Sequence, residues 1–405
     1  MFPALLGAQV QRAVRADTVI VRTAGQGLWR TPQVAVRQLR LTGTAAGEFT
    51  RLGPLVALPN GGVAVVESEL PDGRAAILVI DRTGKLVHRI GRDGSGPGEF
   101  QPRTVALTLL ATPTGDLLLV DDANARLTRW NREGTLTGTT SLGFPIHAFP
   151  PTLAYAPRGG VYVRGRLVPH RPGGGVIDPG TSGFVRIEAD GTATDTLRGR
   201  PAWVGPPAGG ALDPMTTWMP MPDGRVLVVR TDRLRIILAS VDGATPLLAE
   251  QDRSPVRTSP AEFDWMRALA RIQGLPRGQL PELLRLPSVK PVVRAAGIQV
   301  EHSGRIWLPL HGIGTIGRTS RRPIRGQRRD SVTVPETHEP IEFAVFEGDG
   351  RFDGYMSFPL LADEWNGVQR VTVAQDVAWG VVQDRDGAPL LVQWRLPPGR
   401  ESARP

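Results

Sequence analysis

The chain has 405 residues, of which 40% are apolar and 21% are charged, and it contains 48 glycines and 37 prolines. It has no cysteine, which excludes disulfides, thiolate metal sites, a cysteine nucleophile and a cysteine-linked lipid anchor. No apolar run reaches the roughly 18–20 residues that a membrane-spanning helix needs. The formal net charge is +9, and all 48 basic residues except Lys85 and Lys290 are arginines, which pair readily with carboxylates and phosphates.

The N-terminal sequence MFPALLGAQVQRA has a short apolar stretch that ends in Gly7, Ala8 and Gln9. This order is similar to the end of a secretory signal peptide whose basic start is missing, and a frayed terminus is the alternative. We therefore expect residues 1–33 to be an N-terminal segment, a signal-peptide remnant plus a lead-in. The first alternative implies an extracytoplasmic location, periplasmic or secreted, and the second leaves a cytoplasmic one open.

Two kinds of strand unit then recur along the chain. The first is a hairpin whose turn contains glycine, because glycine readily adopts the positive φ of a tight turn. Five copies are present, at Leu78–Ile90, Leu127–Thr139, Phe184–Leu197, Ile236–Ala249 and Phe343–Phe358, with turn glycines Gly84, Gly134, Gly191, Gly243 and Gly350. The second unit is a turn followed by a strongly apolar strand. Its six copies are Pro59–Ser68, Pro113–Asp122, Pro157–Arg166, Pro222–Thr231, His302–His311 and Gln375–Asp384.

The alternation of these units predicts repeats of four antiparallel strands, and the last repeat, ending at Pro389–Leu396, lacks its outer strand. Near the N-terminus, Val36–Phe49 matches Leu86–Phe100 in order and spacing, so a strand near Val34–Leu41 would complete the last repeat. Such closure removes an open sheet edge. The pattern predicts an all-β fold, a six-bladed β-propeller over residues 34–396 with four-stranded antiparallel blades, a ring closed by the N-terminal strand, and a tail at 397–405.

The glycine-rich segment IGRDGSGPGEFQ (Ile90–Gln101) joins two predicted blades. A phosphate-binding loop needs Gly-Lys-Ser/Thr at the start of a helix, and here no such lysine is present and a strand follows. The chain also lacks the HExxH pattern and a GxSxG elbow between a strand and a helix. The absence of these motifs favours a structural role for the segment over an enzymatic one.

The same corner resembles the NHL-type repeat, with the following strand region GDLLLVDDANARLTRWNREG. The residues that carry the resemblance are Glu99, Phe100, Pro102, Asp121, Asn124 and Arg126. The C-terminal part, from Val300 to Leu396, resembles bacterial six-bladed propeller proteins that are largely uncharacterised and often exported. The resemblance implies the propeller fold, on which binding modules, lyases and lactonases all occur. We interpret Asp121, Asp122 and Asn124 as partners of turn backbone rather than calcium ligands.

The longest predicted connections lie on one side of the propeller, where the second and third strands of a blade, and successive blades, are joined. They are Arg166–Ser182, Gln251–Pro291 and His311–Pro340. Long loops on a rigid scaffold often carry function. On this side we expect the ligand- or partner-binding residues, and we choose His147, His170, Arg294, His311, Arg318, Arg321, Arg322 and Arg370. Loop drift without function is the alternative.

Two insertions on this side differ from the strand repeats in their sequence. Residues 254–287 predict one or two short helices, with Ser259 as N-cap and Glu262 completing a capping box. Residues 312–335 form a basic loop, with Arg318, Arg321, Arg322, Arg325, Arg328 and Arg329. A solvated loop is the plain interpretation of this charge run, and an anionic partner is the other. No aromatic residue interleaves with these arginines, which argues against binding of single-stranded nucleic acid.

We conclude from the sequence that the chain is a non-catalytic NHL-like propeller that binds a protein or small-molecule ligand through its long-loop side. No catalytic residue, metal ligand or cofactor is assigned, and a monomer is expected. A metal-dependent lyase or hydrolase at the central channel is the first alternative, because His147, His170 and His311 could converge in space. Binding of nucleic acid or an anionic surface through the arginine-rich loop is the second.

Overall fold

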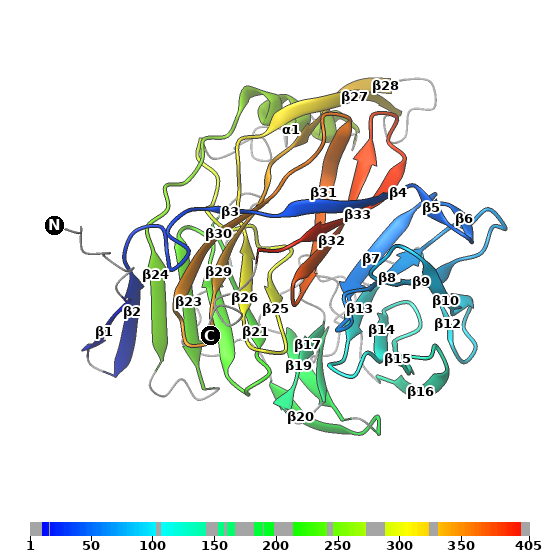
Figure 1. Ribbon diagram of the computed structural model, residues 1–405, viewed down its shortest axis with the longest axis horizontal. Coiled ribbons are helices and arrows are strands. Elements are labelled where there is room, and N and C mark those ends of the chain that lie inside the picture. The colour runs from blue at the N-terminus through cyan, green and yellow to red at the C-terminus, as the bar shows by residue number, and fades with distance from the viewer. Residues whose placement is uncertain are drawn as a thin grey trace, which may run out of the picture.

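The computed structural model describes residues 10–15, 17–102, 107–142, 153–157, 160–166, 182–188, 190–197, 214–240, 246–272, 288–323 and 331–397. Within these residues the chain is nearly all β-structure, with one helix, α1 (Pro260–Ile272). No helix among them is long and apolar enough to cross a membrane. Six of the described sheets have four or more strands, and we number these sheets I to VI in chain order (Figure 1).

Sheets I, II and III are antiparallel meanders in which strands pair in sequence order. Sheet I contains β7 (Leu52–Ala57), β8 (Val63–Glu67), β9 (Ala76–Ile80) and β10 (Leu86–Ile90). Sheet II contains β13 (Thr108–Ala111), β14 (Leu117–Asp121), β15 (Arg126–Trp130) and β16 (Leu136–Ser141). Sheet III contains β17 (Leu153–Tyr155), β18 (Val161–Arg166), β19 (Ser182–Ile187) and β20 (Ala193–Leu197).

Sheets IV, V and VI repeat this meander and add strands from the N-terminal part of the chain. Sheet IV contains β21 (Thr216–Pro220), β22 (Val226–Arg230), β23 (Leu234–Ala239) and β24 (Leu247–Gln251), then β2 (Thr18–Thr23) and β1 (Val10–Arg15). Sheet V contains β25 (Gln299–Val300), β26 (Ile306–Pro309), β29 (Ile341–Phe346) and β30 (Phe352–Phe358), then β3 (Gln33–Val34). Sheet VI contains β31 (Glu364–Ala374), β32 (Val377–Asp384), β33 (Pro389–Arg395) and β4 (Val36–Leu41).

The described part of the N-terminal segment contributes strands to the sheets, which the sequence analysis did not expect. Strand β2 pairs in parallel with β24, and β3 pairs in parallel with β30. The segment passes along the outer edges of sheets IV and V before β4 pairs antiparallel with β33 in sheet VI (Figure 1). The sequence pattern missed β1 to β3 because these strands lie outside the four-strand repeat. Residues 1–9, which carry the proposed signal-peptide remnant, lie outside the described residues.

The hydrophobic core consists of layers between successive sheets. One cluster packs sheet I on sheet II, a second packs sheet II on sheet III, and a third spans sheets III, IV and V. A fourth packs sheet V on sheet VI, and a fifth packs sheet VI on sheet I. The middle strands β8, β9 and β14 are buried along their whole length because both sheet faces are covered. This is why their sequences read as continuous apolar runs.

Sheets VI and I also share specific polar contacts. The backbone N–H of Ala57 donates to Thr372 Oγ1 at 3.0 Å, and Trp379 Nε1 donates to the carbonyl of Gly61 at 3.0 Å. Strand β31 contacts β7, as β7 contacts β13 and β13 contacts β17. The first strand of sheet VI is therefore next to the first strand of sheet I.

Turns divide each sheet into two ends. The turns between the first and second strands and between the third and fourth lie at one end, which we call the tight-turn side. The connections between the second and third strands, and between sheets, lie at the other, the long-loop side. Gly84, Gly134, Gly191 and Gly350 have positive φ in tight turns, as the repeat predicted; Gly243 lies outside the described residues.

The two insertions on the long-loop side pack against each other. Helix α1 contacts β27 (Thr315–Pro323) and β28 (Ser331–His338), which pair antiparallel as a hairpin (Figure 1). Most of the basic loop expected over residues 312–335 is therefore β-structure. Alternation on β28, where Val334 and Glu336 are buried and Thr333 is exposed, is the period-2 signal that the arginine run obscured.

Short two-stranded pairs occupy the corners that lead into sheets I and II. They are β5 (Gly43–Thr44) with β6 (Gly47–Glu48), and β11 (Arg92–Asp93) with β12 (Glu99–Phe100). Phe100 is fully buried, and a Cβ on Gly91, where φ is +71°, would lie 2.7 Å from its ring. Glycine is therefore required at position 91, where the backbone passes close to the ring of Phe100.

Candidate functional site

The structure describes the side chains of four of the eight candidate residues. Arg294, His311, Arg321 and Arg370 are described. His147 and His170 lie outside the described residues. Arg318 and Arg322 have their backbones in β27, but their side chains are likewise outside what the structure describes.

Arg294 and His311 meet at a carboxylate that the sequence analysis did not select. His311 Nδ1 lies 3.1 Å from both carboxylate oxygens of Glu339, and Arg294 Nη1 lies 3.4 Å from Oε2. Lys290 Nζ lies 3.2 Å from Glu339 Oε1 and 2.6 Å from Glu262 Oε1. We call these five residues the Glu339 cluster.

Each member of the cluster comes from an insertion on the long-loop side. Glu262 is in the first turn of α1, and Lys290 and Arg294 belong to the segment between α1 and sheet V. His311 follows β26, and Glu339 joins β28 to β29. The cluster therefore fastens α1, the connection into sheet V and the base of the β27–β28 hairpin to one another.

Burial makes these charges dependent on their partners. The Lys290 side chain is fully buried, and it also donates to the carbonyl of Gly312. Burial by itself disfavours the charged form of Glu339. The hydrogen bond from His311, together with the positive charges of His311, Arg294 and Lys290, outweighs this and lowers the pKa of Glu339 to about 2. Glu339 is thus a fixed anion, whose Oε2 also accepts a hydrogen bond from Gly312 N at 2.8 Å.

Arg294 is the most exposed of the cationic groups around Glu339. The side chain of Arg294 is 26% exposed, whereas those of His311 and Glu339 are 11% and 12% exposed. Because His311 uses Nδ1 on Glu339, its Nε2 is the nitrogen left for a ligand, and it has no hydrogen-bond partner among the described residues. The arrangement can bind an anionic or acceptor group, and it can orient an imidazole for proton transfer.

One sequence signal pointed to this cluster. Lys290 is one of two lysines in a chain that otherwise uses arginine, and it is the buried one. A compact ammonium fits between two carboxylates where the larger guanidinium of arginine needs more room. Glu339 had no signal of its own, because its neighbours Lys290 and His311 are brought to it only by packing of the insertions.

The other two described candidate residues, Arg370 and Arg321, lie outside the Glu339 cluster. Arg370 is in β31 and donates from Nη1 to the carbonyl of Leu52 at 3.0 Å, so it joins sheet VI to sheet I. Burial, and secondarily the charge of Arg51, lowers the pKa of Arg370. Arg321 is exposed on the β27–β28 hairpin. Neither residue contacts the Glu339 cluster in any hydrogen bond or ion pair that the described residues show.

Two of the three residues interpreted as partners of turn backbone, Asp121 and Asn124, hydrogen-bond to backbone groups of the corner, and Arg126 does so as well. Asp121 accepts hydrogen bonds from the backbone N–H groups of Gln101 at 3.0 Å and Ala123 at 3.1 Å. Asn124 Nδ2 donates to the carbonyl of Gly94 at 3.1 Å, and Arg126 Nη1 donates to that of Ser95 at 2.7 Å. These hydrogen bonds join the end of β14 to the glycine-rich corner that precedes sheet II.

The preceding corner uses a different residue for the same purpose. Glu67, at the end of β8, accepts hydrogen bonds from the backbone N–H groups of Thr50 at 3.0 Å and Arg51 at 2.8 Å. It occupies the position that Asp121 has at the end of β14. The side chain of Glu67 is longer than that of Asp121. This explains how it holds the backbone of its corner without the Asp-Asn-Arg run.

Among the described residues, no group of three or more His, Asp or Glu side chains could hold a metal ion. Of the three histidines considered as converging ligands, His311 is the one that the structure describes, and its neighbours in the Glu339 cluster include two basic side chains. Positive charge beside a ligand set disfavours cation binding.

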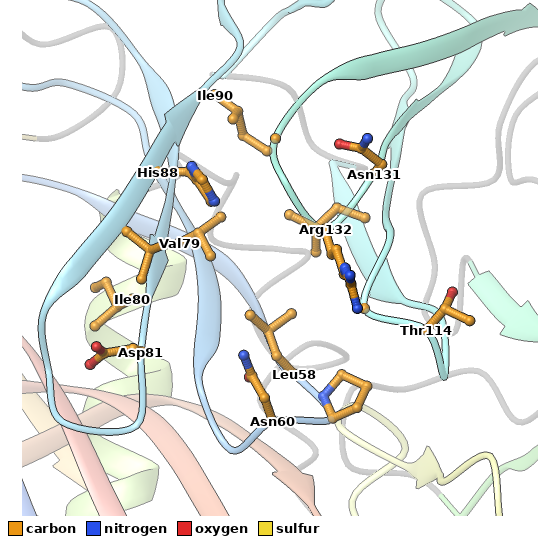
Figure 2. Close-up of a pocket in the computed structure, with 15 residues that line it drawn as sticks. Leu58, Asn60, Val79, Ile80, Asp81, His88, Ile90, Thr114, Asn131 and Arg132 are labelled. Carbon is orange, nitrogen blue, oxygen red and sulfur yellow. The ribbon is translucent and has the colours of Figure 1, made fainter.

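Two hollows lie on the tight-turn side. The first, which we call the I/II cleft, has a volume of about 200 Å³ between sheets I and II (Figure 2). Its lining residues are Leu58, Pro59, Asn60, Val79, Ile80, Asp81, Val87, His88, Ile90, Thr114, Gly115, Leu117, Asn131, Arg132 and Gly134. It combines apolar side chains with polar groups from both sheets, and the sequence analysis, which chose the long-loop side, did not single it out.

The second hollow is an open groove between sheets IV and V, with a volume of about 730 Å³. Its charges are paired within the protein. Arg12 lies 3.1 Å from Asp349, and Arg351 lies 2.8 Å from the same carboxylate. Arg225 donates to the carbonyl of Gly348 at 2.6 Å. This groove offers a ligand fewer free groups than the I/II cleft.

No protein-family model matches the chain, and no curated protein sequence matches it. Similar solved structures include a DUF4221 family member from Bacteroides vulgatus, with 11% identity over 89% of this chain and 97% of that chain, at a TM-score of 0.48. They also include a catalytically inactive virginiamycin B lyase from Staphylococcus aureus with quinupristin, with 12% identity over 88% and 99% and a TM-score of 0.42. Both of these structures are β-propellers.

Proposed function

We propose that the chain is a six-bladed β-propeller that serves as a non-catalytic binding module through its long-loop side. Sheets I to VI are the blades, and β4 completes the last blade and closes the ring. The order of the core layers supports this arrangement, since each sheet packs on the next and sheet VI packs on sheet I. A ring of this kind provides a rigid base for loops.

The Glu339 cluster is the observation that carries the binding role. Burying a lysine and two carboxylates costs desolvation energy, and well-packed apolar residues would hold the insertions at lower cost. The network instead holds the partly exposed Arg294 and the Nε2 atom of His311 in defined positions. We infer that they bind an anionic group, a carboxylate or phosphate, of a ligand or partner. The exposed Arg321 extends positive charge along the neighbouring hairpin.

The test is retention on an immobilised polyanion, heparin, across a salt gradient. In Arg294→Ala with His311→Gln we expect earlier elution, while Arg267→Ala, which removes an exposed arginine paired with Asp264 on α1, serves as the matched control. If Arg321→Ala alone accounts for the loss, the hairpin rather than the cluster is the anionic-surface site. Equal elution of all variants contradicts both forms of the proposal.

The second candidate function is a metal-dependent lyase or hydrolase, in which the His311–Glu339 pair would supply a general base. An imidazole held at Nδ1 by a carboxylate, with Nε2 open, is the arrangement of a general base. Metal analysis of the purified protein separates the two candidates. Stoichiometric zinc or calcium that is lost in His311→Ala supports the enzyme, and metal-free protein that still binds the polyanion supports the binding module.

A further inference from the structure

One wall of the I/II cleft carries a glycine where sheet II comes close to sheet I. Gly134, in the turn between β15 and β16, has φ of +80°, and a Cβ there would lie 2.8 Å from Ile90 Cγ2 and 3.4 Å from His88. Any other residue would therefore push into the space between the two sheets. The opening is about 200 Å³, which corresponds to about six or seven water molecules at roughly 30 Å³ each.

The inner part of the cleft is apolar. Leu58, Val79, Ile90 and Leu117 line it and are each less than 9% exposed. These side chains come from both sheets, so a ligand in the cleft would contact the two blades together. A surface of this kind favours a compact hydrocarbon group, such as a phenyl ring or a short alkyl chain.

The rim of the cleft is rich in hydrogen-bond donors. The Oδ1 atom of Asn60 accepts a hydrogen bond from Gly62 N at 3.0 Å, and that of Asn131 accepts one from Thr135 N at 2.8 Å. Both amide oxygens are thus used within their own turns, which leaves the NH₂ groups as the available atoms. The orientation of each amide follows from these turn hydrogen bonds.

Two further side chains on the rim have hydrogen-bond donors without a partner among the described residues. Arg132 uses Nε on Glu133 Oε1 at 2.6 Å, and its terminal nitrogens have no hydrogen-bond partner among the described residues. The imidazole of His88 likewise makes no hydrogen bond to any described residue. Figure 2 shows His88 on the sheet I wall and Arg132 on the sheet II wall, with both directed toward the space between them, and Asn60 below.

Two acidic residues near the rim each use one carboxylate oxygen within the protein. Asp81 Oδ1 accepts hydrogen bonds from the N–H and hydroxyl of Thr83, at 2.8 and 2.7 Å, and from Lys85 N at 3.0 Å. Glu133 is paired with Arg132. The rim thus carries unused donor groups on Asn60, Asn131 and Arg132, of which Arg132 is a cation.

We propose that the I/II cleft is a binding site for a small carboxylate with an apolar body. The carboxylate accepts hydrogen bonds from His88, Asn60 and Arg132, and the hydrocarbon part lies against Leu58 and Ile90. This site is on the side opposite the Glu339 cluster and is independent of the binding role proposed there.

Isothermal titration with benzoate and hexanoate, and with benzamide and hexanamide as neutral isosteres, tests the site. We expect the unmodified protein to bind one carboxylate per chain in the millimolar range or tighter, and the neutral amides at least about tenfold more weakly, because they lose a charge-assisted hydrogen bond. No saturable binding of either carboxylate, or equal binding of acid and amide, overturns the proposal.

Two variants and a matched control locate the binding. Asn60→Asp keeps the oxygen that accepts from Gly62 N, so the turn is retained, but it replaces the donor by an anion; we expect benzoate affinity to fall at least about tenfold. His88→Ala removes a second donor, on β10 of the same sheet, and should also weaken benzoate binding. Gln11→Glu makes the same charge change on exposed β1 and should leave it unchanged. Benzoate affinity that survives both cleft variants, or falls equally in the control, overturns the proposal.

Discussion

At the scale of single residues, Glu339 shows how buried charge organises the long-loop side. It accepts hydrogen bonds or ion pairs from Lys290, Arg294, His311 and the backbone of Gly312, and removing it would leave a fully buried lysine with Glu262 as its remaining carboxylate. An uncompensated buried charge costs far more than an exposed one. The stability of the insertions therefore depends on this one carboxylate.

We predict that Glu339→Gln lowers the free energy of unfolding by about 3 kcal/mol at neutral pH. The folded-state pKa of Glu339, about 2, lies below its usual 4.5, so its contribution is complete above about pH 4.5 and is lost as the pH falls toward 2. Urea titrations at several pH values check this: the gap between the two proteins should narrow with acid. Asp264→Asn, in an exposed pair, is the control. A gap that is absent at neutral pH contradicts the prediction.

Asp353 should give the opposite pH dependence. Burial, and then the hydrogen bond and charge of Glu347, raises its pKa to about 7 from 3.8. The folded protein thus holds a proton that the unfolded chain releases, so this group's contribution is present below about pH 4 and is lost as the pH rises through 7. We predict that Asp353→Asn is more stable than the unmodified protein at pH 8 and that thermal unfolding shows this gain shrinking by pH 5. A similar gain from exposed Asp349→Asn would show that net charge, not burial, is the cause.

At the scale of elements, sequence patterns predicted the structure correctly where a hydrogen bond between residues close in the sequence determines it. The capping box predicted at the start of α1 is present: Ser259 N donates to Glu262 Oε2 at 2.7 Å, and Glu262 N donates to Ser259 Oγ at 3.3 Å. The β27–β28 hairpin was instead expected to be a loop. Its strands are stabilised by packing on α1, which no local pattern contains.

The capping box permits a measurement on α1. We predict that Ser259→Ala lowers the free energy of unfolding by about 1 kcal/mol, because the N–H of Glu262 loses its side-chain acceptor. Chemical denaturation measures the change, and Ser254→Ala, at an exposed position five residues earlier, serves as control. Since Glu262 also pairs with Lys290, polyanion retention should weaken if α1 loosens the Glu339 cluster. An unchanged stability would mean that packing alone sets the start of the helix.

At the scale of the whole molecule, the N-terminal part of the chain connects three sheets. Strands β2, β3 and β4 add in turn to sheets IV, V and VI, and β4 pairs with the last strand of the chain that the structure describes, β33 (Figure 1). The pairing covers the edge of β33, so that β4 becomes the outer strand of sheet VI. Closure of the proposed ring depends on this contact between residues that are 350 or more positions apart in the sequence.

A designed disulfide tests the proposed closure. Val36 and Arg395 are opposite each other in the β4–β33 pair, both are exposed, and the chain has no other cysteine to compete. We predict that Val36→Cys with Arg395→Cys forms an intramolecular disulfide in air. The oxidised form should be about 2–4 kcal/mol more stable to unfolding than the reduced form. Mass spectrometry and denaturation with and without reductant provide the measurement, and the single-cysteine variants provide the control. A pair that does not oxidise would contradict pairing of β4 with β33.

The sequence by itself determined the features that depend on neighbours along the chain. Glycine-containing turns at regular intervals, apolar strands between them and the capping box are local, so the repeats and the corner at Asp121 and Asn124 could be predicted from residue order. The tertiary structure alone decided where charges meet and where space remains. Lys290, Arg294 and His311 converge on Glu339, and Asn60, His88 and Arg132 surround a cleft, because sheet packing joins segments that no sequence spacing relates.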